Sequence, residues 1–511
     1  VSKRSTALLS HPKKPGGAPI GVFMRHPWAQ TVTLPQNGPM DEFVRKQARN
    51  DYQVAALWRL GIRHLRVPIS DVMDTQSRNR MRDLAAIGHQ FTVSGFGVPA
   101  GAQRAALLGV WLAVAISAIV FAEPAPVDFL LMALVVVLPL LGVAPVSKPL
   151  VPYLVLWLVV TATGCISTLA AFDMSLASKH VFVTFYLSMA SVVLAAFVEQ
   201  APGQRVQLIM SAYMVAAVVA TLAALVGYFN IAPSLSELLT EFGRARGTFK
   251  DPNVYGAFVV PALVFALHLG FSRGGLRGLL AFAVAGLLLL GVLVSFSRGA
   301  WSNTALSLAV YLYLSFVTAR SHRQRFRLAG LVVAAGLCGA GLLAVALQSE
   351  AVSNLLSERA QVAQDYDVGP NGRFGGHEKA KALILEHPFG IGPLQFAHNY
   401  HNEDVHEVYY NVTLGHGWLG GAAYSVIVIM SLIIGWIAAL RPTGLQPATI
   451  AVLASYVGTV GEGFVVDTDH WRHFFLLLSL LWGLYLGTRP STKLPARALR
   501  PALPAMAPAA A

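Results

Sequence analysis

The chain has 511 residues, of which 55% are hydrophobic and only 12% are charged, and its formal net charge is +13. Soluble domains carry about 25% charged residues, so this composition excludes a soluble globular chain. The positive excess is spread over short loops and both terminal segments, which orients membrane proteins and argues against nucleic acid as a partner. We therefore expect membrane lipids to surround most of the chain.

Residues 1–100 precede the first long apolar run. Residues 1–40 are rich in Pro, Gly and Lys, a composition typical of disorder. Farther along, "HLRVPIS" predicts a strand, "QSRNRMRDLAAIG" a helix and "QFTVSGFG" a second strand. A lone strand–helix–strand buries little surface, so we interpret residues 1–100 as a partly disordered cytoplasmic extension and assign it no function.

Apolar runs recur after Arg104 up to Leu486, and a run of about 20 apolar residues crosses a bilayer as a helix. They predict an all-α polytopic membrane protein with about twelve transmembrane helices. Residues 105–347 would hold helices one to nine, residues 418–488 helices ten to twelve, and residues 489–511 a basic tail. Placing both termini in the cytoplasm keeps the basic loops inside, whereas the opposite orientation would export the cluster Arg320–Arg327.

Two loops on the external side are long, at residues 230–253 and 348–417. Loops longer than about 12–15 residues are usually functional or disordered. The second loop combines turn sequences such as "HPFGIGP" with the amphipathic segment "EKAKALILEH". We therefore predict a helical periplasmic cap over residues 348–417.

Basic residues in these external segments run against the orientation rule. They are Arg244, Arg246 and Lys250 in "FGRARGTFKDPNVYG", Arg298 in "SFSRGAW" and Arg373 in "PNGRFGG". The planar guanidinium binds phosphate through paired hydrogen bonds, so these residues predict a site for an anionic head group such as a diphosphate. The alternative is that they pair with nearby acids, which are Glu237, Glu241 and Asp251 for the first group and Asp365 and Asp367 for Arg373. No acid lies near Arg298 in sequence.

The stretch "NYHNEDVHEVYYNVTLGHGWLGG" ends the second external loop with many titratable groups, which are His401, Glu403, Asp404, His406, Glu407 and His416. A metal could bind to His398, His401 and His406 with Glu403, Asp404 and Glu407, but H-x2-H-x4-H matches no zinc template, so we predict no metal site. The alternative is one histidine acting as a general base, since histidine titrates near neutral pH. Glycines in "PFGIGP" and "GHGWLGG" permit close backbone approach, or they serve ordinary turns and helix packing.

Four motifs follow one another on this twelve-span frame: "RGTFKDPNVYG", "SRGAW", "GRFGG…HPFGIG", and His406 followed by Gly417 and Gly420. Their order resembles the O-antigen ligase and O-antigen polymerase superfamily of bacterial membrane glycosyltransferases, over about residues 105–488. The resemblance implies a GT-C-like fold in the inner membrane. It also implies a metal-independent, inverting transfer from a polyprenyl-diphosphate-linked glycan on the periplasmic face, with no cofactor.

Carried onto this sequence, the resemblance makes His406 the base and Arg298 and Arg373 the catalytic arginines. Further candidates for binding the diphosphate or sugar are Arg246, Arg244, Lys250, Glu407 and His401. The family usually has Asn, Ser or Gln after the motif histidine, whereas this chain has Glu407, which could raise the basicity of His406 or bind a sugar hydroxyl. His401 is followed by Asn402 but lacks the matching glycines, so we choose His406.

Four functions remain open. A ligase would transfer the glycan to a sugar hydroxyl of the lipid A core, and a polymerase to the non-reducing end of another lipid-linked repeat. A protein acceptor is a further variant of the same chemistry. A transporter of polysaccharide precursors belongs to a different class and would place polar residues near the bilayer centre, whereas here the charges cluster at the outer boundary.

Overall fold

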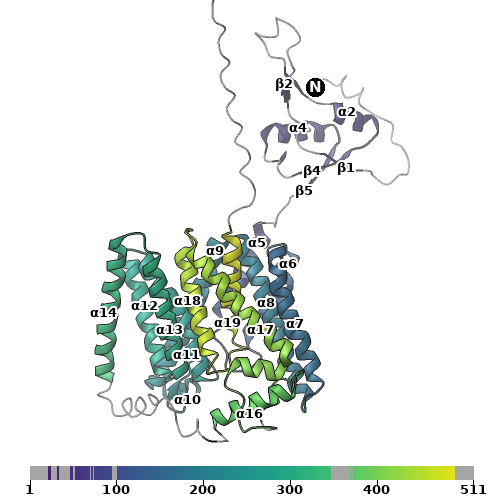
Figure 1. The fold of residues 1–511 in the computed structure, drawn as a ribbon. Helices are drawn as coiled ribbons and strands as arrows, with labels where there is room; N and C mark the ends of the chain where they lie inside the picture. The colour runs from purple at the N-terminus through teal and green to yellow at the C-terminus, as the bar shows by residue number, and fades with distance from the viewer. Residues whose placement is uncertain are drawn as a thin grey trace, which may run out of the picture. The chain divides into compact units, whose positions relative to one another are not determined.

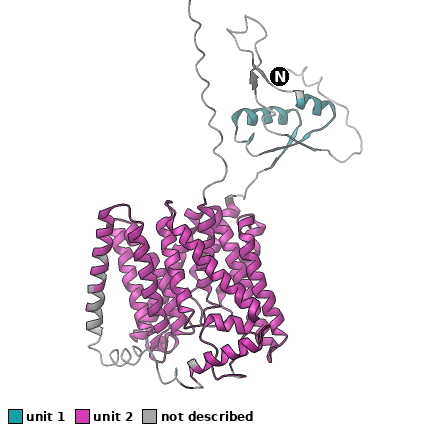
Figure 2. Ribbon diagram, in the orientation of Figure 1, with its two compact units in different colours: residues 1–99 teal, residues 100–511 magenta. Residues whose placement is uncertain are grey.

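The computed structural model describes residues 21–24, 31–33, 47–49, 52–68, 71–72, 74–94, 100–346, 369, 372–397 and 399–489. The chain divides into two compact units, Val1–Pro99 and Ala100–Ala511 (Figure 2). The start of the predicted cap, residues 348–368, lies outside the described residues, and so does the tail beyond Arg489.

Unit 1 is a small α/β fold. Its parallel sheet has the order β1 (Gly21–Phe23), β4 (His64–Pro68), β5 (Gln90–Ser94), and its helices are α2 (Tyr52–Arg59) and α4 (Thr75–Ala86). β2 (Thr31–Thr33) pairs antiparallel with β3 (Gln47–Arg49).

The predicted strand–helix–strand is confirmed as β4, α4 and β5, and it contributes to a core formed by Met24, Val54, Leu65, Val67 and Leu84. β1 and β2 lie within residues 1–40, for which composition predicts disorder. Apart from Met24, the rest of that range lies outside the described residues.

Unit 2 is a helical bundle (Figure 1). Its described long helices are α5 (Ala100–Ala115), α6 (Pro126–Leu140), α7 (Val151–Thr168), α8 (Met174–Gln200), α9 (Pro202–Tyr228), α11 (Pro252–Ser272), α12 (Gly275–Val294), α13 (Arg298–Val317), α14 (His322–Ala346), α17 (Val408–Leu440), α18 (Gln446–Glu462) and α19 (Arg472–Gly487). The short elements are η2 (Lys148–Leu150), α10 (Pro233–Leu239), β6 (Thr240–Glu241), β7 (Arg244–Ala245) and α16 (Arg373–Glu386). Each predicted span corresponds to one of the long helices.

Within the described residues, 7 helices are long and apolar enough to cross a membrane, which makes this a polytopic membrane protein. They are Lys148–Thr168, Met174–Gln200, Pro202–Tyr228, Pro252–Ser272, Gly275–Val294, Arg298–Val317 and Val408–Leu440. α5, α6 and α19 are shorter apolar helices. Large apolar side chains such as Phe129, Leu140 and Leu279 are exposed on the bundle, as expected where lipid replaces water. That all twelve helices cross the bilayer stays a prediction.

Consecutive long helices run in opposite directions, so their connections alternate between the two ends of the bundle. One end, here called the site end, is formed by the connections 116–125, 169–173, 229–251, 295–297, 387–407 and 463–471. α10 and α16 lie at this end (Figure 1). Contacts bind these connections together: Val120 N donates to Thr248 O at 2.9 Å, and Asp173 N donates to Gln395 Oε1 at 2.9 Å.

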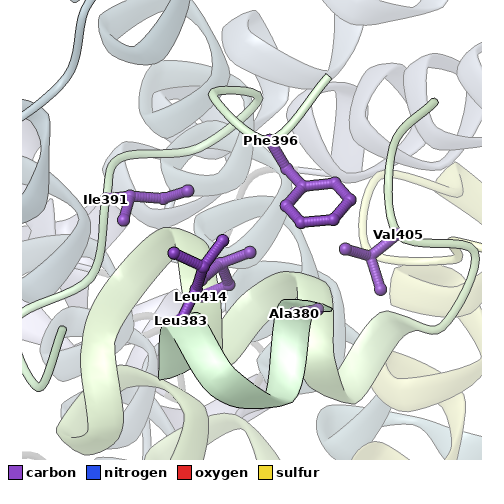
Figure 3. Close-up of a cluster of buried hydrophobic side chains, with 6 residues drawn as sticks. All are labelled: Ala380, Leu383, Ile391, Phe396, Val405 and Leu414. Carbon is purple, nitrogen blue, oxygen red and sulfur yellow. The ribbon is translucent and has the colours of Figure 1, made fainter. Parts of the chain in front are cut away.

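The described part of the predicted cap comprises α16 and the connection 387–407. A small apolar core joins it to the start of α17 (Figure 3), and its members are Ala380, Leu383, Ile391, Phe396, Val405 and Leu414. The segment predicted to be amphipathic, "EKAKALILEH", forms most of α16 and supplies two of these residues. The cap is therefore anchored on the bundle by apolar contacts, which hold its polar residues at the site end.

α17 is interrupted at Gly417, where φ is 73° and ψ is 177°. A Cβ at this position would lie 2.6 Å from Pro388 O and 2.7 Å from the carbonyl carbon of Phe389. Trp418 N donates to Pro388 O at 2.9 Å, and Ile391 N donates to Leu414 O at 2.9 Å. The "PFGIGP" and "GHGWLGG" segments thus pack directly on one another. α17 begins at Val408, before the predicted start at residue 418, and its part after the break matches the predicted tenth span.

Candidate functional site

A cavity of about 320 Å³ opens at the site end. Its wall comes from the connections 116–125, 229–251 and 463–471 and from the first turns of α11 and α19. The charged and titratable side chains on this wall are Glu123, Lys250, Asp251, Asp467, Asp469, His470, Arg472 and His473. Such a group of ionisable residues in a concave site of a membrane protein marks a candidate functional site.

The positive charges on the cavity wall are held by acids. Arg472 donates two hydrogen bonds of 2.7 Å to the carboxylate of Asp128, which is 2% exposed and caps α6 by accepting from Ala125 N. Glu123 lies 3.1 Å from Lys250 Nζ and 3.9 Å from Arg472. The paired bonds fix the guanidinium plane, so Arg472 ties the start of α19 to the start of α6.

Two further acids on the cavity wall are Asp467 and Asp469, which lie in the connection between α18 and α19. His180, in the second turn of α8, places its Nε2 3.0 Å from Asp469 Oδ2. The rings of His180 and His470 stack with their centroids 3.8 Å apart, and His470 Nε2 lies 2.8 Å from Thr184 Oγ1. Two side chains of the connection, Asp469 and His470, thereby contact two side chains of α8, His180 and Thr184.

The pKa values of Asp467 and Asp469 are shifted in opposite directions. Burial, reinforced by the nearby charge of Asp469, raises the pKa of Asp467 well above its usual value, although a hydrogen bond from Asn411 opposes the shift. Burial also opposes ionisation of Asp469, but its histidine neighbours His470 and His180 outweigh burial and lower its pKa. Two neighbouring acids whose pKa values are shifted apart in one cavity are typical of functional sites.

The part of this wall between α18 and α19 was not expected from the sequence. "VDTDHWRH" lies in a short connection between the last two spans, and no candidate residue was chosen from it. A signal was present, because five ionisable side chains within eight residues are costly at a membrane boundary. Their partners Asp128 and His180 are far away in sequence, so pattern alone did not indicate the pairing.

Of the predicted basic residues, Lys250 lines the cavity and Arg244 is buried in the fold. Arg244 Nε donates to Ser295 O at 2.9 Å, and Arg244 Nη2 donates to Asn253 Oδ1 at 2.7 Å. Arg244 therefore joins the external loop to the α12–α13 turn. Lys250 does not pair as the sequence alternative suggested, since the acid beside it is Glu123 rather than a neighbour in its own loop.

Arg246 is closer to the alternative in which the basic residues pair with acids of their own loop. It donates to the carbonyl oxygens of Leu238 and Lys250 at 3.2 Å each, and its guanidinium lies 3.9 Å from the carboxylate of Glu241. These contacts brace the loop, and the side chain keeps 22% of its surface exposed. A partly exposed guanidinium on a braced loop can still meet an anionic ligand.

Arg298 is the first residue of α13 and is half-buried. An acid lies near it in space although none lies near it in sequence: a Cβ on the adjoining Gly299 would be 2.7 Å from Glu462 Oε1. Glu462 is 1% exposed and accepts a 2.7 Å hydrogen bond from Asn303 Nδ2. Arg373 is the first residue of α16, and its side chain lies outside the described part of the chain.

His401 and His406 lie in the connection before α17. His406 is 43% exposed, with Nε2 3.4 Å from Glu403 Oε2. The ring of His401 stacks on Phe396, and its Nδ1 accepts from Glu403 N at 3.3 Å. Nε2 of His401 is a buried atom without a hydrogen-bond partner among the described residues. His398 lies outside the described residues.

Glu407, the departure from the family pattern, caps α17. Its carboxylate accepts a hydrogen bond from Tyr410 N at 3.3 Å, and burial raises its pKa to about 7. Among the described residues, neither His406 nor Glu407 lines the cavity. The nearest link is the first turn of α17, where Val408 N donates to Gly463 O at 2.9 Å and Asn411 donates to Asp467.

No model of a known protein family matches this chain, and a search of curated proteins finds no match. The fold and the cavity by themselves define a polytopic helical membrane protein with an ionisable site at one end of its bundle.

Proposed function

We propose that this protein is an O-antigen ligase-like glycosyltransferase. It would move a glycan from a polyprenyl-diphosphate-linked donor to the lipid A core. The observation that carries the proposal is the meeting of the motif segments at one end of the bundle: "RGTFKDPNVYG", "SRGAW", "HPFGIGP" and the His406 stretch all lie in or beside connections of the site end. An enzyme acting on a lipid head group needs its basic and proton-accepting groups together at the membrane boundary.

We place the site end on the periplasmic side of the bacterial inner membrane, with both termini in the cytoplasm. The connections at the opposite end carry the basic residues Lys148, Arg273, Arg320 and Arg441. Because positive charge is retained on the cytoplasmic side, this asymmetry favours the orientation. We further propose twelve crossings and a GT-C-like arrangement with the cap on the periplasmic side.

The proposed reaction is a single inverting displacement. An acceptor hydroxyl attacks the anomeric carbon, the bond from that carbon to the diphosphate oxygen breaks, and the diphosphate leaves with the bonding electrons. His406 takes the proton of the acceptor hydroxyl. Arg298, Arg373 and Arg246 stabilise the charge that develops on the leaving diphosphate. The chemical step needs no metal and no cofactor.

The remaining predicted residues receive narrower roles. Lys250 and its partner Glu123 would bind sugar hydroxyls on the cavity wall. Arg244 would hold the external loop, since its donors are engaged within the fold. Glu407 would hold the start of α17 beneath His406, and His401 would pack the cap through its contact with Phe396.

The test is glycan transfer by the purified full-length protein in proteoliposomes, with a polyprenyl-diphosphate-linked glycan and a lipid A-core acceptor. His406→Ala should reduce turnover by roughly 100- to 10,000-fold, the usual contribution of a general base, while donor binding persists because the arginines remain. His401→Ala is the matched control and should lose much less.

Other results would redirect the assignment. Transfer only to a second lipid-linked repeat would make the protein a polymerase with the same chemistry. Donor crossing the bilayer without any transfer would make it a transporter. Normal turnover in His406→Ala with a dead His401→Ala would move the base to the earlier histidine.

A further inference from the structure

His180, Asp469 and His470 form a compact cluster that the proposed transfer does not use. One ligand atom from each residue lies within 4.8 Å of the other two. His180 comes from α8, whereas Asp469 and His470 come from the connection 463–471. Side chains from two segments far apart in sequence therefore converge on one point of the cavity wall.

A second buried carboxyl group, that of Asp467, lies beside the cluster. Asp467 and Asp469 lie two positions apart, and Asp467 Oδ1 is buried without a hydrogen-bond partner within the described part of the chain. Arg472, the nearest arginine in sequence, is engaged with Asp128. Within the described residues, no lysine or arginine forms an ion pair with Asp467 or Asp469. For a positive partner among these residues, Asp469 therefore has only its histidine neighbours, and a buried carboxylate is stabilised by a cation bound beside it.

His416 gives a second, independent indication. It is 3% exposed, and its ring nitrogens form no hydrogen bond of good geometry among the described residues, although the backbone of Val412, one turn earlier, lies close enough to interact with the ring. Its ring centroid lies 6.3 Å from that of His180. A buried imidazole without partners is uncommon, because burying a polar group without a hydrogen bond is unfavourable. A bound ion beside His180 would give this ring a nearby partner.

The donor set fits a transition metal. Two imidazoles and one carboxylate, with further positions open to water, are the ligands of many zinc sites, and imidazole is a preferred ligand of divalent transition metals. The cavity supplies room for that water. Thr184 Oγ1, 2.8 Å from His470 Nε2, orients the ring as outer-shell partners of metal-binding histidines do.

From these contacts we infer that His180, Asp469 and His470 bind a divalent transition-metal ion, Zn²⁺ in the first instance, with His416 beside it. The ion joins α8 to the connection between α18 and α19 and so holds the cavity wall. This site is separate from His398, His401 and His406, the histidines considered from the sequence as possible metal ligands. The inference does not rest on glycosyl transfer, because its readout is metal binding.

The test uses the purified full-length protein, stripped with chelator and titrated with ZnCl₂ alone. We expect one zinc per chain by calorimetry and by metal analysis after dialysis, and a higher melting temperature in zinc, because a ligand that binds the folded state stabilises it. Asp469→Asn and His470→Gln should each weaken zinc binding at least tenfold. The control His406→Gln, in the other histidine group, should bind zinc as the wild type does.

Co²⁺ bound to the wild-type protein provides a measurement that does not depend on the variants folding. Its visible absorption reports nitrogen and oxygen ligation, and Zn²⁺ should displace it at one equivalent. The inference is overturned if the wild type shows no saturable binding of either ion, or if His406→Gln weakens zinc as much as Asp469→Asn.

Discussion

Glu407 caps α17 with a carboxylate that is 7% exposed. Burial opposes ionisation and raises its pKa from 4.5 to about 7, whereas the unfolded chain keeps the lower value. Between these two pH values the folded protein holds a proton that the unfolded chain releases. The contribution of Glu407 to stability is therefore fully present below about pH 4.5 and is lost as the pH rises through 7.

The variant Glu407→Gln tests whether stability falls as the pH rises, as expected for this carboxyl group. Glutamine keeps an oxygen that can accept from Tyr410 N, but it does not titrate. We expect the wild type to lose melting temperature relative to Glu407→Gln between pH 5 and pH 8, by a few degrees. Thermal unfolding in detergent at both pH values measures this, with the exposed acid variant Glu378→Gln as control. A difference between wild type and Glu407→Gln that is equal at the two pH values would contradict the assignment.

At the scale of elements, the contact between the cap and α17 depends on backbone approach. Gly417 has φ 73° and ψ 177°, a conformation that is essentially restricted to glycine. Pro388 and Phe389 occupy the space where its Cβ would be. Backbone atoms cannot swing aside as a flexible side chain can, so the cap stays seated only while residue 417 is glycine.

Gly417→Ala should therefore destabilise the protein by about 1–3 kcal/mol and loosen the cap. The measurements are melting temperature and the rate of protease cleavage within residues 387–407. The control is Gly286→Ala in α12, where a Cβ would meet no atom within 4 Å and helix propensity improves. Equal melting temperatures and cleavage rates for the two variants would show that the close approach is not needed.

Across the whole molecule, the helices could be predicted from sequence because a long apolar run is a local property. The start of α17 could not, since its first turns mix polar and apolar residues directly after the charged stretch that ends at Glu407, and their apolar partners Ile391 and Phe396 lie in the cap. The cavity wall could not be predicted either. Its bonds join residues 344 and 289 positions apart, Arg472 with Asp128 and His180 with Asp469, and tertiary packing alone creates such pairs.

The orientation of the bundle in the membrane, with the site end in the periplasm, can be tested directly. Gly369 lies in the connection before α16, and Gln324 lies in the first turn of α14, beside Arg323 and Arg325. The inner side of a membrane retains such arginines. A reporter enzyme that works only in the periplasm should therefore be active when fused after Gly369 and silent when fused after Gln324.

A reporter that works only in the cytoplasm, fused at the same two positions, is the control for this topology and should give the inverse pattern. Reversal of both patterns would place the cap inside and overturn the periplasmic site. Identical signals at the two positions would show that α14 does not cross the bilayer. In that case the twelve alternating spans would not explain why the cavity and the cap lie at the same end of the bundle. The prediction therefore tests the membrane orientation on which the proposed roles of the arginines and histidines depend, and it needs no substrate.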